Sequence, residues 1–110
     1  MQEIRKFNAE RDWEQFHSPK NLAMALLVEA GEVAEIFQWL TGEESRSLSP
    51  QDQEKVRQEI GDVLIYLVSL ADQLDIDPLN AAKDKMCLNA ARYPIEKARG
   101  QAKKYTEYES

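Results

Sequence analysis

The chain has 110 residues, of which 43% are hydrophobic and 31% are charged, and its formal net charge is −6. This size fits one domain with one modest core, and the composition excludes a disordered class. Polymeric nucleic acid is not expected as a partner, because phosphate contacts need a basic face, and no uncharged apolar stretch approaches the roughly 20 residues that span a membrane. We therefore expect a cytoplasmic protein.

Helices are the only elements that the sequence pattern predicts. Near the N-terminus, Ile4, Phe7 and the absence of breakers indicate a helix over about residues 2–16. Three later helix starts share one pattern, in which a capping residue precedes proline. They are Ser18-Pro19, Ser49-Pro50 and Asp77-Pro78. The capping side chain accepts a free N–H, and proline at the first helical position has no N–H to leave unpaired, so helices should begin near residues 19, 50 and 78.

The ends of these helices are predicted from glycine, proline and polar residues. The first should end at Thr41-Gly42, where glycine can cap the C-terminus, and residues 43–49 should form a loop. The second should end near Leu74. The third should run to Arg92 and stop before Pro94, because proline disfavours helix at the preceding residue.

No segment alternates apolar and polar residues as a half-buried strand would, so the predicted fold class is all-α. Residues 22–40 and 60–74 are apolar on nearly every side, and a helix of that kind must be buried all round. In a chain of four helices, the other two helices are too few to cover every face of these two apolar helices. We therefore expect a four-helix bundle over residues 1–95 that is completed by subunit association, followed by a charged C-terminal extension over 96–110.

Two pairs of carboxylates interrupt these apolar runs, each with the spacing acid-x-x-acid. Glu29 and Glu32 lie in the first run, and Glu59 and Asp62 open the second. Positions three apart share one face of a helix, so packing of the two helices would bring four carboxylates together. A single acid-x-x-acid pair is commonly part of a solvated helix face. The apolar neighbours of both pairs favour a cation site instead, because four repelling carboxylates are costly to bury without protonation or a cation.

The oxygen ligands suit Mg²⁺, with Mn²⁺ as a substitute, better than zinc or copper. Mg²⁺ is usually held by a few carboxylates while substrate phosphates and water fill its other positions, so a phosphate ester is implied as the substrate. The single histidine, His17, and the single cysteine, Cys87, exclude a Cys/His zinc site within one subunit. A ferritin-like di-iron site is disfavoured too, because it needs Glu-x-x-His on two helices.

Three stretches, taken in order, carry a resemblance to a known family. They are WEQFHSPKNL at residues 13–22, EAGEVAEIFQW at 29–39 and EIGDVLIYL at 59–67, with Lys85-Met86, Asn89 and Arg92-Tyr93-Pro94 in the last helix. The chain resembles the MazG-like all-α nucleoside triphosphate pyrophosphohydrolases over about residues 4–94. Within them it is most similar to the dCTP pyrophosphatase branch.

The resemblance implies an enzyme that uses Mg²⁺ to split a deoxynucleoside triphosphate, most simply dCTP or a modified dCTP, into the monophosphate and pyrophosphate. The metal ligands that it implies are Glu29, Glu32, Glu59 and Asp62. It also implies a homodimer or homotetramer. Val28 stands where many relatives have a second glutamate, which leaves open the number of metal ions and the identity of the base. Gly61 stands where the branch often has serine.

Aromatic side chains near the acids are candidates for stacking on a flat base, at about 1–3 kcal/mol each. They are Trp13, Phe16, Trp39 and Tyr66, with core packing as the alternative for each. The resemblance assigns Trp13 and Trp39 to the base pocket. It also favours substrate binding for His17, whose alternative is to cap the turn at Ser18. Glu14, Gln15 and Asn21 are further candidates for base or sugar recognition.

A basic stripe is predicted on the last helix, where Lys85, Asn89 and Arg92 stand at i, i+4 and i+7. These side chains could face the phosphates, or they could form a solvated face near the helix C-terminus. The resemblance places Tyr93 in the same motif.

In the predicted mechanism, Glu29 or Glu32 accepts the proton of the attacking water, while Lys85 and Arg92 steady the departing pyrophosphate. Two alternatives stay open at this point. One is a broad-specificity house-cleaning nucleoside triphosphate pyrophosphatase, and the other is a non-catalytic helical nucleotide-binding or interaction module.

Overall fold

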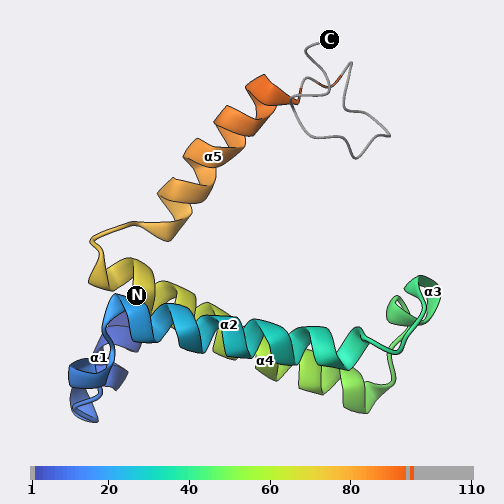
Figure 1. Cartoon of the computed structure of the whole chain (residues 1–110), viewed down its shortest axis with the longest axis horizontal. Coiled ribbons are helices and arrows are strands. Elements are labelled where there is room, and N and C mark those ends of the chain that lie inside the picture. The colour runs from blue at the N-terminus through green and yellow to red at the C-terminus, as the bar shows by residue number, and fades with distance from the viewer. Residues whose placement is uncertain (1, 94, 96–110) are drawn as a thin grey trace. The chain divides into compact units, whose positions relative to one another are not determined.

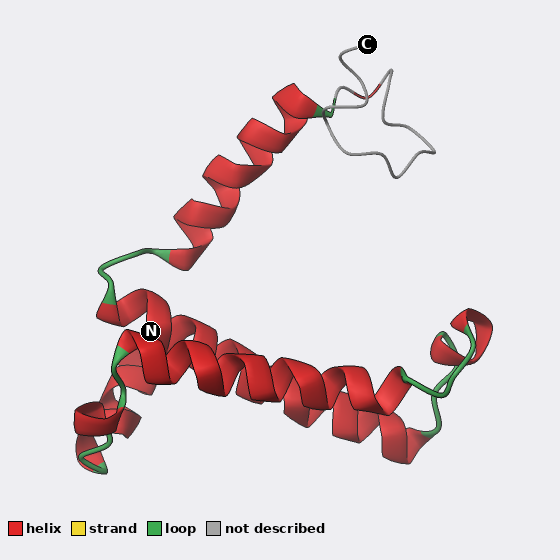
Figure 2. Cartoon of the chain, in the orientation of Figure 1, coloured by secondary structure: helices red, strands yellow, loops and turns green. Residues whose placement is uncertain are grey.

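The computed structural model describes residues 2–93 and 95. In these residues the chain forms five α-helices and one 3-10 turn and no strand, which confirms the all-α prediction (Figure 2). The elements are α1 (Gln2–Glu10), η1 (Glu14–Phe16), α2 (Pro19–Phe37), α3 (Gly42–Ser45), α4 (Pro50–Gln73) and α5 (Pro78–Arg92). No helix in the described residues is long and apolar enough to cross a membrane.

The chain divides into two compact units, residues 1–76 and 77–110, and each is described by itself. The first unit holds α1 to α4, and the second holds α5. Residues 96–110 lie outside the described residues, so the domain boundary expected after residue 95 stays a prediction.

The three helix starts lie at the predicted prolines. Ser18 and Ser49 each accept a hydrogen bond at 3.1 Å from the backbone N–H three residues later. Asp77 accepts the backbone N–H groups of Leu79 at 3.0 Å and Asn80 at 3.2 Å. These side chains pair N–H groups that have no partner inside the helix. The predicted ends near Leu74 and at Arg92 are also confirmed.

The predicted end of the first long helix is wrong. α2 ends at Phe37, and Gly42 begins α3 instead of capping α2. Thr41 and Glu44 form a capping box, in which Thr41 Oγ1 accepts the N–H of Glu44 at 3.1 Å and Glu44 Oε1 accepts the N–H of Thr41 at 2.9 Å. This capping box starts a new helical turn, α3. The first part of the loop that we expected over residues 43–49 is therefore helical.

The helix expected over residues 2–16 is interrupted. α1 ends at Glu10, and Asp12 takes the left-handed conformation with φ at 54°. The N–H of Trp13 then donates to the carbonyl of Asn8 at 3.0 Å, which satisfies a free carbonyl at the end of α1. Aspartate enters the left-handed region more readily than most side chains, so the break needs neither glycine nor proline.

The helices α2 and α4 lie side by side in opposite directions and form the body of the first unit (Figure 1). Among the described residues, Leu22 and Ala71 are the hydrophobic side chains that are buried. Large apolar side chains on the outer faces of this pair stay exposed, namely Met24, Leu27 and Val28 on α2 and Ile60, Leu64 and Leu67 on α4. Exposed apolar faces of this kind are typical of surfaces that bind another subunit. They agree with the expected subunit association, which itself stays a prediction.

Candidate functional site

Three carboxylates meet at the seam between α2 and α4. Glu29 comes from α2, Glu59 and Asp62 come from α4, and one oxygen of each lies within 4.8 Å of the others. Glu29 and Glu59 are half-buried, and the Oε2 atom of each is shielded from solvent with no hydrogen-bond partner. Shielded carboxylate oxygens without donors are costly, and a hard divalent cation is a partner that they fit. The three residues could therefore hold such an ion.

The electrostatics of the seam agree with this interpretation. Burial raises the pKa of Glu29 to about 7, and the neighbouring carboxyls of Glu59, Glu32 and Asp62 add to the rise. Burial also raises the pKa of Glu59; Glu29 opposes this rise, and Glu32 and Asp62 add to it. Without a cation, the seam therefore favours a proton on this pair of glutamates, and a bound cation would take the place of that proton.

Glu32, the fourth predicted ligand, is not one of the three carboxylates that meet within 4.8 Å. It is close enough to raise the pKa of Glu29, and it lines an open groove of about 460 Å³ together with Glu59 and Lys55. Its assignment as a metal ligand or as the base stays a prediction.

A pocket of about 210 Å³ lies directly beside the cluster. It is lined by Phe7, Asn8, Trp13, His17, Asp62, Ile65, Tyr66 and Ser69. The rings of Phe7 and Trp13 meet edge to face with their centroids 5.4 Å apart, and the guanidinium of Arg11 lies 3.7 Å from the centroid of Phe7. Aromatic walls with a few polar groups suit a planar heterocycle, and the shared Asp62 joins this pocket to the carboxylates.

The structure brings three of the predicted substrate residues into this pocket, namely Trp13, His17 and Tyr66. Glu14 lies beside His17 in an adjoining cavity of about 20 Å³. Gln15 braces the turn before η1, because its Nε2 donates to Asp12 Oδ2 at 2.9 Å.

The other two predicted aromatic residues do not line the pocket. Phe16 is 61% exposed and Trp39, just beyond the end of α2, is 87% exposed. Within the first unit, these exposures exclude core packing for both side chains. Their contact with a substrate stays a prediction.

Four residues that line the pocket were not predicted as site residues, namely Phe7, Asn8, Ile65 and Ser69. Ile65 and Ser69 follow Asp62 at i+3 and i+7 on α4, so the helical repeat could have found them. Phe7 and Asn8 depend on how α1 packs against α4, which no local pattern reports.

The residues Lys85, Asn89 and Arg92 all lie in α5 at the predicted helical spacing. The backbone N–H of Tyr93 closes this helix by donating to the carbonyl of Asn89 at 2.7 Å. Because α5 belongs to the second unit, the role of this stripe toward phosphates stays a prediction.

Comparison with known proteins gives a direct match to one family. The profile of the MazG-like family matches residues 24–108, a stretch that includes both acid pairs and α5. The chain belongs to the MazG-like family. The resemblance inferred from the sequence motifs is thus confirmed, and the MazG-like match begins after the segment that supplies Phe7, Asn8, Trp13 and His17 to the pocket.

Proteins named dCTP pyrophosphatase 1 align with nearly the whole chain. The dCTP pyrophosphatase 1 of Homo sapiens is 47% identical over 113 aligned residues, which cover 97% of this chain and 66% of the relative. The protein of the same name from Bos taurus is 46% identical, with 97% and 67% covered. The chain spans about two thirds of the length of these relatives.

A solved structure is similar as well. The crystal structure of a pyrophosphatase from Archaeoglobus fulgidus superposes with a TM-score of 0.78 at 41% sequence identity, over 83% of this chain and 85% of that chain. The all-α fold class inferred from the helical pattern, and the MazG-like fold implied by the resemblance, therefore agree with both kinds of comparison.

Proposed function

We propose that this chain is a nucleoside triphosphate pyrophosphohydrolase that converts dCTP or a modified dCTP, with water, into the monophosphate and pyrophosphate. The observation that carries this proposal is the position of Asp62, which belongs both to the carboxylate cluster and to the aromatic pocket. One substrate can thus place its phosphates at the cluster and its base in the pocket. The names of the relatives, dCTP pyrophosphatase 1 and pyrophosphatase, support the same class of reaction.

Mg²⁺ is the ion that we propose for the cluster, with Mn²⁺ as a substitute, because all the available ligands are carboxylate oxygens. Glu29, Glu59 and Asp62 would hold it. When bound, such an ion supplies positive charge against the phosphates of the substrate.

Glu32 is the residue that we propose as the base for the attacking water. Among the four predicted acids it is the one outside the tight group, so a cation held by the other three engages it least. It lines the open groove with Glu59, and solvent reaches that groove. Glu29, the other candidate base, has an oxygen that is shielded from solvent, which fits a metal ligand better.

The pyrophosphate end of the substrate needs positive charge from the protein. The stripe on α5 supplies two cations and an amide in Lys85, Arg92 and Asn89, and we propose that it contacts the phosphates. Tyr93 follows directly and is proposed to border the same site.

We propose that copies of the chain associate as a homodimer or homotetramer in the cytoplasm. The support is the apolar outer surface of the α2/α4 pair, where Leu27, Val28 and Ile60 are each more than half exposed. A second copy would remove this apolar surface from water. Light scattering at micromolar concentration tests this, and a monomer would contradict it.

The activity is tested by incubating the protein with Mg²⁺ and each deoxynucleoside triphosphate in turn and resolving the products. We expect dCMP and pyrophosphate from dCTP, with inorganic phosphate appearing only after an inorganic pyrophosphatase is added. Similar kcat/KM values for all the triphosphates would indicate the broad house-cleaning activity instead. Nucleotide binding without any product would indicate a non-catalytic module.

A further inference from the structure

One face of α4 carries more than the metal and pocket residues. Asp62, Tyr66, Ser69 and Asp72 follow one another at intervals of four, three and three residues, so they form a single stripe along the helix. Asp62, Tyr66 and Ser69 line the pocket. Asp72 does not line the pocket, and its side chain makes a different contact.

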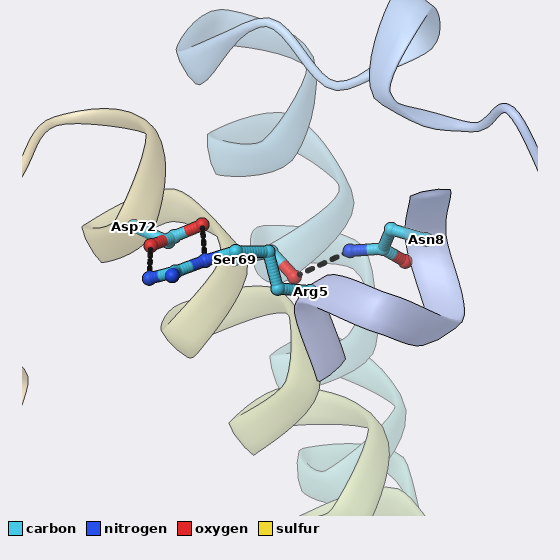
Figure 3. A network of polar contacts seen from close by, with 4 residues as sticks. All are labelled: Arg5, Asn8, Ser69 and Asp72. Atoms are coloured by element: carbon cyan, nitrogen blue, oxygen red, sulfur yellow. Dashed lines mark hydrogen bonds and ion pairs between the residues drawn. The ribbon is translucent and has the colours of Figure 1, made fainter. Parts of the chain in front are cut away.

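That contact is with α1, which two polar pairs hold against α4 (Figure 3). Arg5 donates from Nε to Asp72 Oδ2 at 3.0 Å and from Nη2 to Asp72 Oδ1, a bidentate ion pair. Asn8 donates from Nδ2 to Ser69 Oγ at 3.4 Å. Both pairs use residues three apart, and their order along α1 is opposite to that along α4, so together they fix the register of the two helices.

The two pairs differ in burial. Asn8 and Ser69 are 8% and 7% exposed, and among the described residues they are the buried polar ones. A polar contact in such a place is costly to break, because each partner would be left buried without it. The side chains of Arg5 and Asp72 are partly exposed, so their ion pair adds direction more than energy.

The held helix leads directly to the pocket wall. The N–H of Trp13 donates to the carbonyl of Asn8 at 3.0 Å, and the ring of Trp13 meets the ring of Phe7 edge to face. Asn8 is therefore bonded to Ser69 through its side chain and to Trp13 through its backbone. Movement of α1 along α4 would displace the Phe7 and Trp13 wall from the side chains of Ile65 and Tyr66 across the pocket.

We propose that Arg5 and Asn8 are positioning residues, which set the width of the nucleoside pocket by fixing α1 on Asp72 and Ser69 of α4. This inference rests on the proposed function, because it assigns the pocket to the nucleoside end of the substrate. The carboxylates Glu29, Glu59 and Asp62 come from α2 and α4, not from α1. Loosening α1 should therefore weaken substrate binding and leave the reacting groups in place.

The first test breaks the ion pair. Arg5→Ala should raise the KM for dCTP about two- to fivefold with kcat changed less than twofold, as expected for an exposed pair that acts on binding. The exchange of charges in the double variant Arg5→Asp, Asp72→Arg should restore KM to within about twofold of the original value. Lys6→Ala is the matched control, because Lys6 pairs with Glu10 on α1 itself, so it should leave KM unchanged.

The second test breaks the buried pair. Asn8→Ala should raise KM by about tenfold, since a buried hydrogen bond is lost. If this variant does not fold, Ser69→Ala removes the same bond with a smaller change in volume and should raise KM in the same direction. A fall in kcat at constant KM in the folded variants would overturn the positioning role.

A third test needs no turnover. The chain has two tryptophans, so in a Trp39→Phe background the fluorescence reports on Trp13 alone. Arg5→Ala in this background should make Trp13 more accessible to acrylamide quenching, while the far-ultraviolet dichroism stays that of the parent, and unchanged quenching would overturn the inference. If the wild-type chain hydrolyses no triphosphate, the proposed function fails, whereas the quenching still decides whether Arg5 holds the wall formed by Phe7 and Trp13.

Discussion

Glu29 of α2 and Glu59 of α4 meet across the seam of the helix pair, and each has one carboxylate oxygen, Oε2, that is shielded from solvent and has no hydrogen-bond partner. Two carboxylates in this position cannot both stay charged without help. A proton provides that help in the metal-free chain, and a divalent cation would provide it in the loaded one. The stability of the fold should therefore depend on pH and on metal in a linked way.

The first prediction concerns the pH dependence of the metal-free chain. The pKa of Glu29 is about 7 in the fold against an ordinary value of 4.5, so the folded state binds more protons than the unfolded state between these values. The free energy of unfolding should therefore fall as the pH rises from about 4.5 to about 7. Urea unfolding in EDTA across this range measures the slope.

The variant Glu29→Gln should remove most of that slope and stabilise the metal-free chain at pH 8, because the amide carries no charge to repel its neighbours. Glu54→Gln is the control, since Glu54 is an exposed residue of α4 that pairs with Arg57. It should keep the slope of the wild type. An equal slope in the Glu29→Gln variant would contradict the burial argument.

The second prediction concerns the metal itself. At a Mg²⁺ concentration about a hundredfold above its Kd, binding to the folded state should stabilise the chain by about 2.7 kcal/mol. Thermal unfolding at pH 8 with and without Mg²⁺ should show this as a rise in Tm. The rise should shrink at pH 6, where a proton competes for Glu29, and it should vanish in Asp62→Asn.

Much of this site could be predicted from the sequence because its signals are local. A serine or aspartate before proline caps a helix through its own neighbours, so the starts at Pro19, Pro50 and Pro78 could be located from the sequence. The acid pairs gave the inner faces of α2 and α4 in the same way. Here the helical repeat decides which residues share a face, and two apolar helices in a small chain have to pack together.

The rest depended on contacts between distant residues. The break after Glu10 arises because Asp12 accepts a left-handed turn, which glycine usually marks. The pairs Arg5–Asp72 and Asn8–Ser69 span 67 and 61 residues, and no periodic pattern links such positions. The pocket could therefore be predicted where motifs supplied Trp13, His17 and Tyr66 and where the helical repeat leads to Ile65 and Ser69, but not at the residues of α1.

The third prediction separates the two candidate bases. Glu32→Gln should lower kcat by at least about a hundredfold, as the loss of a general base does, while the rise in Tm with Mg²⁺ is kept. Glu29→Gln should lose that rise as well as the activity, because Glu29 belongs to the tight group of three. Wild-type turnover by Glu32→Gln would exclude Glu32 both as the base and as a required metal ligand.

The fourth prediction compares two of the aromatic residues that are proposed to bind the base, Trp13 and Phe16. Trp13 lines the pocket, so Trp13→Ala should weaken dCTP binding by about 1–3 kcal/mol, the usual value of a base stacked on an aromatic ring, and so raise KM by about 5- to 150-fold. Phe16→Ala is a useful comparison, because Phe16 lies in the neighbouring turn but outside the pocket. A larger effect from Phe16 than from Trp13 would mean that the base binds elsewhere.

The fifth prediction tests the stripe on α5, which the structure leaves as a separate unit. If Arg92 contacts the phosphates, Arg92→Ala should lower kcat/KM by about tenfold or more, because a charge-assisted bond to the substrate is lost. Lys83→Ala removes a charge from the same helix, two residues before Lys85 and therefore off the stripe, and should change kcat/KM less than twofold. Both variants should keep the Tm of the parent in EDTA. Equal losses from Arg92→Ala and Lys83→Ala would mean that net charge, rather than a stripe facing the phosphates, governs activity.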